Sequence, residues 1–140
     1  MAVEISPYLY PRGDVREALE TYRRALRGSE PEVTTYGQIG MPDPASADLV
    51  ANAMLRSEVV GVLMVSDYPP GMPEEQRPPA GGLAVWGDDG PMLEAAWEVL
   101  SEGAEVHQDL SPSPWGTRFG TLTDRWGVSW MFDVAAPATA

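Results

Sequence analysis

Few side chains in this sequence could carry out catalysis. There is no cysteine, which excludes thiol nucleophiles, disulfide scaffolds and cysteine-ligated zinc. His107 is the only histidine, and it stands in neither the H-x-E nor the H-x-x-x-H spacing of metal sites. Because His107 lies on a predicted strand between Val106 and Gln108, we interpret it as a surface or partly buried residue rather than a base.

Hydroxyl and carboxyl groups give no stronger catalytic signal. The Ser-Pro-Ser-Pro run at 111–114 lacks the glycine-flanked turn that exposes a serine nucleophile, and we expect a stiff loop that orients Trp115. Asp88 and Asp89 suit a helix cap, and Asp43 suits a turn. The sequence therefore predicts no catalytic residue.

Aromatic side chains are more informative, because the chain has five tryptophans. Trp97 lies on a predicted helical stripe and is expected in the core. The other four lie on strands and loops of the second half: Trp86, Trp115, Trp126 and Trp130. They could stack on a flat organic molecule or fill a core or a dimer interface, and both readings stay open. Arg118 and Arg125 could bind an anionic ligand or pair with the chain's own carboxylates.

The charge of the chain limits its partners. The net charge is −12, and all nine basic residues are arginine. Nucleic acids and anionic membranes require clustered positive charge, so neither is an expected partner. The longest apolar run, 59–65, is far shorter than the roughly 20 residues that span a bilayer. We expect a cytoplasmic protein.

The chain has 140 residues, and the elements that position these side chains are short and fall into two similar halves. In the first half, 1–67, we predict strands at 3–10, 32–39, 48–56 and 59–66 and a helix from Asp14 to Gly28. A connection rich in proline and glycine follows at 68–81. In the second half, 82–134, we predict strands at 82–86, 104–109, 117–123 and 128–134 and a helix that starts at Asp88 or Asp89 and ends before Gly103. The tail, 135–140, is expected to fray.

The second half repeats the first. An offset of 74 residues pairs identical residues at several positions with structural roles: Leu9 with Leu83, Gly13 with Gly87, Asp14 with Asp88, Leu19 with Leu93, Glu20 with Glu94, and Leu26 with Leu100. Unrelated segments as long as 9–26 would share about one identical residue. The sequence therefore predicts an α+β fold of two tandem βαβββ modules, which form a curled, cleft-enclosing mixed sheet.

Several motifs in this order resemble a known family. They are Ser-Pro-Tyr-Leu-Tyr at 6–10, Ala-Leu-Glu-x-Tyr at 18–22, Tyr-Gly at 36–37, Gly-Val-Leu-Met-Val-Ser-Asp at 61–67, Trp-Gly-x-x-Phe-Gly at 115–120 and Asp-Arg-Trp-Gly-Val-Ser-Trp-Met at 124–131. Together they resemble the PhnB-like branch of the glyoxalase/bleomycin-resistance/dioxygenase superfamily, also called the vicinal oxygen chelate superfamily. The resemblance implies the glyoxalase-like fold. Because one sheet face of each module stays open, two modules must pair around a cleft, either within the chain or across a homodimer.

The resemblance also implies where a metal would bind. Catalytic members hold a divalent ion with His, Gln or Glu from the first and fourth strands of each module, and the matching positions here are Pro7, Met64, Gly82 and Met131. None of these side chains is a ligand for a hard metal ion. We therefore expect neither a metal nor another cofactor.

These expectations combine into one prediction of function: a metal-free, small-molecule-binding or non-catalytic homodimer. Strand alternation predicts that a cleft for a hydrophobic or aromatic ligand is lined by Tyr36, Met64, Ala84, Trp86, Trp115, Arg118, Ser129 and Met131. Two alternatives stay open. One is a metal-dependent lyase, isomerase or dioxygenase, and the other is a drug-sequestering resistance protein whose acidic cleft holds cationic aromatic compounds.

Overall fold

The computed structural model describes residues 3–41 and 43–136. Its elements follow the chain in this order: β1 (Tyr8–Leu9), α1 (Val15–Ala25), β2 (Glu32–Thr35), β3 (Val50–Ser57), β4 (Gly61–Val65), a 3-10 turn η1 (Glu74–Gln76), β5 (Gly82–Gly87), α2 (Gly90–Ser101), β6 (Glu105–Pro112), β7 (Arg118–Thr123) and β8 (Ser129–Val134). None of the helices in this part of the chain is both long and apolar enough to cross a membrane.

The strands form two four-stranded sheets with the same topology. The first has the order β1-β4-β3-β2 and the second the order β5-β8-β7-β6. In each sheet the first strand of the module runs parallel to the fourth, while the other pairs are antiparallel. The prediction of an α+β fold with two tandem βαβββ modules is confirmed.

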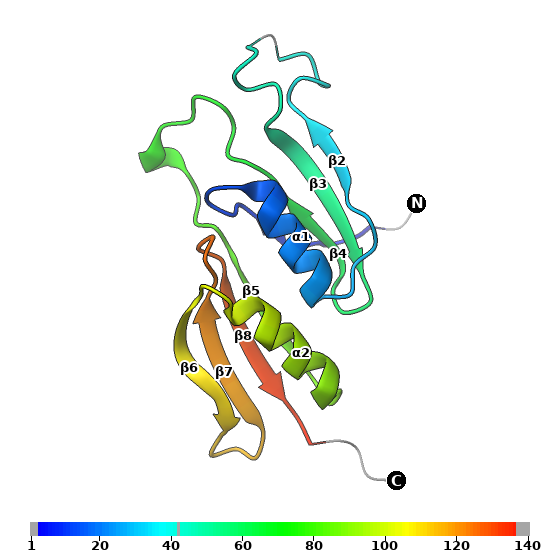
Figure 1. Cartoon of the computed structure of the whole chain (residues 1–140), viewed down its shortest axis with the longest axis vertical. Coiled ribbons are helices and arrows are strands. Elements are labelled where there is room, and N and C mark those ends of the chain that lie inside the picture. Colours follow the sequence, from blue (N-terminus) through cyan, green and yellow to red (C-terminus); the bar gives the residue numbers. More distant parts are fainter. Residues whose placement is uncertain (1–2, 42, 137–140) are drawn as a thin grey trace.

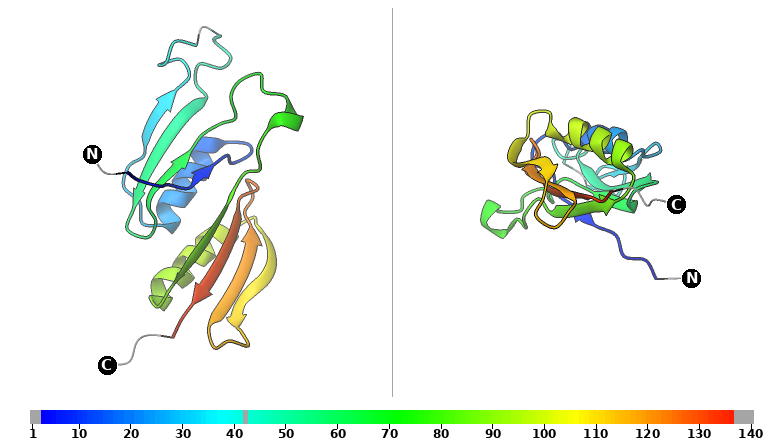
Figure 2. Two further views of the ribbon diagram at one scale, coloured as in Figure 1. Left: turned by 180° about the vertical axis from the view of Figure 1, so that it is seen from behind. Right: turned by 90° about the horizontal axis from the view of Figure 1, so that it is seen from below.

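The two sheets do not close around a cleft within the described residues, which corrects the expected cleft-enclosing sheet. The modules lie end to end in an elongated molecule, with α1 and α2 in contact with each other (Figure 1). Seen from behind, both helices lie behind the sheets, and the near faces of the sheets carry no helix (Figure 2). Each module therefore buries one sheet face under its own helix and leaves the other face open.

Local signals explain both helices. The Asp14 carboxylate accepts a hydrogen bond from the Glu17 amide at 3.1 Å and caps α1 as predicted. In α2 the cap is Asp89, whose carboxylate accepts from the Met92 amide at 3.2 Å, and not Asp88. Proline in the first turn of α2 has a fixed φ that suits this position.

The two helices match at the positions that the internal repeat pairs, whereas the connections between strands differ in length. Leu19 of α1 and Leu26 at its C-cap are buried in the core, as are their counterparts Leu93 and Leu100 of α2. The pairing of Asp14 with Asp88 as caps is off by one residue. The connection between the second and third strands spans 36–49 in the first module and only 113–117 in the second, so the common offset ends there.

Two strands are shorter than predicted. The strand expected at 3–10 is reduced to β1, because Pro7 has no amide hydrogen for a ladder; Val3 and Ile5 before it are 93% and 96% exposed. The strand expected at 32–39 ends at Thr35, where the Gln38 side chain accepts from the Thr35 amide and the Thr35 hydroxyl accepts from the Gln38 amide. This reciprocal pair turns the chain away from the sheet.

The long connection between the modules is ordered by contacts with β1 and with itself. The Tyr68 ring stacks on Tyr10 at 4.9 Å, and the Tyr68 hydroxyl donates to the Pro78 carbonyl at 2.6 Å. The Arg77 guanidinium lies 5.1 Å from the centre of the Tyr68 ring. The connection therefore closes on itself as a compact loop rather than acting as a flexible linker.

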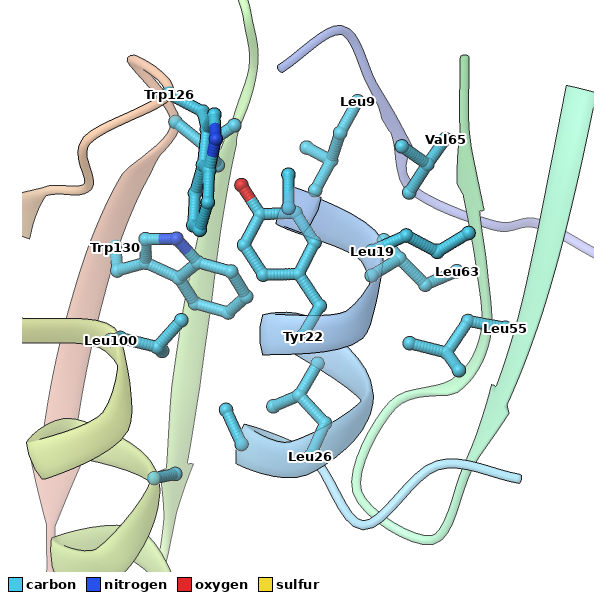
Figure 3. Packing of buried hydrophobic residues seen from close by; sticks show 14 of the residues in the cluster. Leu9, Leu19, Tyr22, Leu26, Leu55, Leu63, Val65, Leu100, Trp126 and Trp130 are labelled. Atoms are coloured by element: carbon cyan, nitrogen blue, oxygen red, sulfur yellow. The ribbon is translucent and has the colours of Figure 1, made fainter. Parts of the chain in front are cut away.

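A buried carboxylate joins the two modules. Asp124, in the turn before β8, accepts from the Tyr22 hydroxyl of α1 at 2.6 Å and from the Trp130 indole nitrogen at 3.0 Å. Its other oxygen accepts from the amides of Trp126 and Val128. The Tyr22 ring packs against the indoles of Trp126 and Trp130 in the core (Figure 3). Burial and the Asp124 charge raise the pKa of Tyr22 far above its usual value, so its hydroxyl remains a donor.

We predict that Tyr22→Phe lowers the free energy of unfolding by about 2 kcal/mol, because it removes a buried hydrogen bond to a charged group. Urea unfolding followed by circular dichroism measures this change. Tyr68→Phe is the matched control: its hydroxyl bond to Pro78 lies at the surface, and we expect a loss of about 0.5 kcal/mol. Equal losses in the two variants would contradict the role given to the buried pair.

Candidate functional site

Strand alternation defines the open face of the second sheet. Trp130, Phe132 and Val134 of β8 are buried on the side of α2, so the residues between them point the other way. The register places neighbours from β5 and β7 beside them. The open face consists of Gly82, Ala84 and Trp86 on β5, Phe119, Thr121 and Thr123 on β7, and Ser129, Met131 and Asp133 on β8.

A shallow groove of about 410 Å³ runs along one part of this face. Its lining includes Ala84, Ser129 and Met131, three residues predicted from the sequence, together with Thr121 and His107. The sequence predictions for this stretch of the second module therefore come together on one surface.

The groove ends at one side in polar groups. The His107 imidazole Nε2 lies 2.8 Å from the Thr123 hydroxyl, and Thr123 pairs in register with Ser129. Sequence reasoning treated His107 as a plain surface residue. The register of β6 shifts on both sides of Gln108, and no short-range pattern in the sequence indicates such a shift.

The other end of the open face is aromatic and acidic. Asp133 pairs in register with Trp86 on one side and Phe119 on the other. The Trp115 ring contacts Phe119 edge-on at 5.2 Å. Trp86 is 78% exposed and Trp115 57% exposed. Sequence reasoning missed Phe119 and Asp133, although counting alternate residues along the predicted strands 117–123 and 128–134 would have placed both on this face.

The first sheet has an open face of a different character. Tyr8, Met64 and Met54 lie side by side across β1, β4 and β3. Tyr10 approaches Tyr8 with ring centres 5.0 Å apart. Burial raises the pKa of Tyr36, and the neighbouring phenol of Tyr8 adds to the effect. Met64 and Tyr36 thus belong to the first module, whereas the exposed tryptophans belong to the second.

Arg118 does not join the open face, which corrects the prediction that it lines the cleft. It forms an ion pair with Glu94 of α2, on the helix side of the second sheet. Arg125 pairs with Glu17 of α1, and its guanidinium lies 4.4 Å from the Trp126 ring. Both arginines pair with carboxylates of the chain, which was the other reading of the sequence.

The residues at the four positions that could hold a metal do not fit one. Pro7 and Met64 meet on the first sheet, where the Pro7 carbonyl accepts from the Met64 amide at 3.0 Å. Gly82 and Met131 lie on the open face of the second sheet. A thioether is a soft, neutral donor, and proline and glycine side chains offer none. Within residues 3–41 and 43–136, no three His, Cys, Asp or Glu residues are grouped so that they could hold an ion.

A larger cavity, of about 530 Å³, lies beside the start of α1 and the compact loop. Its lining contains both arginines and carboxylates, including Arg12, Arg77, Asp67 and Glu74. Burial raises the pKa of Asp67, while the hydrogen bond from the Val50 amide opposes that shift. Because charges of both signs line this cavity and no exposed tryptophan does, its size alone does not make it the better ligand site.

Comparisons with known proteins agree with this geometry. Residues 4–132 match the family model of the glyoxalase/bleomycin resistance protein/dioxygenase superfamily. The solved structure of protein PA1353 from Pseudomonas aeruginosa is 32% identical, with a TM-score of 0.77, over 96% of this chain and 99% of that one. No curated protein gives a significant match.

Two more distant structures show the same fold. A PhnB protein from Bacillus cereus is 20% identical, with a TM-score of 0.72, over 95% of this chain and 100% of the other. TioX from Micromonospora sp. ML1 is 22% identical, with a TM-score of 0.55, over 99% of this chain and 100% of the other.

We predict that the purified protein, dialysed against zinc, nickel or manganese and then against buffer, retains far less than one ion per chain. The reason is the lack of hard donors at Pro7, Met64, Gly82 and Met131. Elemental analysis by mass spectrometry measures the content. One tightly held ion per chain, lost on Ser129→Ala or His107→Ala, would show that the groove contains ligands other than those considered.

Proposed function

The chain belongs to the glyoxalase/bleomycin resistance protein/dioxygenase superfamily, and within it we propose that the protein is a metal-independent, small-molecule-binding homodimer. The observation that carries this proposal is the open face of the second sheet. It presents exposed indoles, a thioether and hydroxyls along one surface, at the level of the sheet where the superfamily's metal donors would stand.

The case for a dimer rests on the two uncovered faces. The modules lie end to end, both helices are on the same side, and the two open faces look in the same direction (Figure 2). One face of a chain therefore cannot cover the other. A twofold dimer solves this problem, because the first-sheet face of each copy can cover the second-sheet face of its partner.

The chemistry of the two faces supports this pairing. The first offers Tyr8, Met54 and Met64, and the second offers Trp86 and Met131. Apolar groups of this size at the surface mark an interaction site. Pairing would produce two identical clefts, each with thioether and aromatic groups on both walls, which suit a flat or hydrophobic ligand held by stacking and dispersion.

A second candidate is a sequestering protein for cationic aromatic compounds. The net charge of −12 attracts cations to the surface, and the exposed Trp86 and Trp115 rings can stack on aromatic compounds. No observation favours the metal-dependent lyase, isomerase or dioxygenase. A cytoplasmic location is compatible with the absence of cysteine and stays a prediction.

We predict that Met131→Glu converts the dimer to a monomer, because it places a charge in the centre of the covered face. Light scattering after size-exclusion chromatography measures the mass. Ala95→Glu introduces the same side chain on the exposed side of α2 and should leave the dimer intact. A wild-type protein that is monomeric at high micromolar concentration would contradict the dimer.

We also predict that Trp86→Ala weakens binding of flat aromatic compounds by roughly tenfold through loss of stacking. Compounds found by thermal shift would be titrated with calorimetry. Trp97→Phe is the control, since Trp97 packs edge-on against Phe132 at 5.3 Å on the helix side and should not contact the ligand. Equal affinities for wild type and Trp86→Ala would place the ligand elsewhere.

A further inference from the structure

Asp133 is a carboxylate within the aromatic end of the open face. Its neighbours in the register are Trp86 and Phe119, and Trp115 extends the group through its contact with Phe119. From this arrangement we propose that the ligand carries a basic group, which Asp133 binds while the rings hold the aromatic body. This inference rests on the proposed function, because it concerns the ligand of the same cleft.

One carboxylate oxygen of Asp133 can still accept a hydrogen bond from a ligand. The Thr117 hydroxyl donates to one of its carboxylate oxygens. The hydrogen bonds among the described residues do not engage the second oxygen, and the ion pairs in this part of the chain do not include Asp133. The Thr117 bond fixes the carboxylate, so the second oxygen is held in place for a donor.

The cations of the second module lie elsewhere. Arg118 pairs with Glu94 on the helix side, and Arg125 pairs with Glu17 of α1. His107 is at the opposite end of the face, beside Thr123. Asp133 therefore has no counter-ion among the described residues on its own surface. Covering this face with a second copy would remove the carboxylate from water, and an unpaired charge there is costly.

A basic aromatic ligand removes that cost. Its ammonium or amidinium group pairs with the carboxylate, and the faces of the flanking rings also attract a positive charge. An anionic ligand of the same shape would be repelled by Asp133, and a neutral one would leave it unpaired. The preference of the cleft for a positively charged ligand therefore depends on Asp133.

The experiment compares three flat aromatic probes of similar size and different charge: 9-aminoacridine, 9-anthracenemethanol and 9-anthracenecarboxylate. Binding to the intact protein at neutral pH is measured by calorimetry. We expect the cationic probe to bind best to the wild type. Asp133→Asn keeps the oxygen that accepts from Thr117 and should weaken the cationic probe by roughly tenfold. The neutral probe should bind Asp133→Asn at least as well as the wild type, because the substitution removes the unpaired charge.

Three variants test whether the preference for the cationic probe comes from Asp133 itself or from the general negative charge of the protein. Asp109→Asn removes a carboxylate that lines a cavity on the helix side, and Glu105→Gln removes one that pairs with Thr123 at the far end of the open face. Both should keep the preference for the cationic probe. Thr117→Val removes the hydroxyl partner of Asp133 but not the charge, and it should also keep the preference.

The outcomes distinguish this inference from the proposed function. If the wild type binds all three probes equally, or if Asp133→Asn keeps the preference, the role of Asp133 is overturned while the binding cleft stands. If Asp109→Asn reduces the preference as much as Asp133→Asn, the effect comes from overall charge and the inference fails. If the wild type binds none of the probes, the proposed function fails, and the inference fails with it.

Discussion

The arrangement of the molecule depends on the buried Asp124 carboxylate. It accepts hydrogen bonds from the Tyr22 hydroxyl, the Trp130 indole and the Trp126 and Val128 amides, so a helix of the first module and the last hairpin of the second share one charge. A buried charge is tolerated only when all of its donors remain in place. The modules are therefore held end to end with both helices on one side. In this position the two open sheet faces cannot meet within the chain, and a closed cleft needs a second copy.

The same alternation of side chains serves stability and binding. On β8, Trp130 and Phe132 pack under α2, while Ser129, Met131 and Asp133 between them form the open face. A βαβββ module has only one helix to cover its sheet, so each strand divides its residues between a core and a surface available to ligands. The short connection at 113–117 distinguishes the second module, because it brings Trp115 against Phe119 and concentrates the exposed aromatic rings at one end.

The fold of the superfamily is retained here, and we propose that the donors for a metal are not. At the positions that the family resemblance implies for metal ligands, Met64 and Met131 offer only thioethers, and Gly82 lies beside Ser129 with no side-chain donor. Such a surface favours dispersion, stacking and a single ion pair over polarisation of a substrate by an ion. This difference explains why we infer binding as the function, and why the identity of the ligand depends on the residues around Asp133.

Short-range periodicity, capping signals and an internal repeat are enough to predict the modules, their helices and the inward-facing residues of the strands. Residue spacing alone assigns Leu19 and Leu93 to the core, and Ala84, Trp86 and Met131 to one face. The remaining features depend on contacts between distant segments and became visible only in the folded chain. Folding paired Arg118 with Glu94, turned His107 toward Thr123, placed Asp133 between two aromatic rings and left both sheets open. Strand register and the docking of modules are set by packing between residues far apart in the chain, and no local pattern in the sequence encodes them.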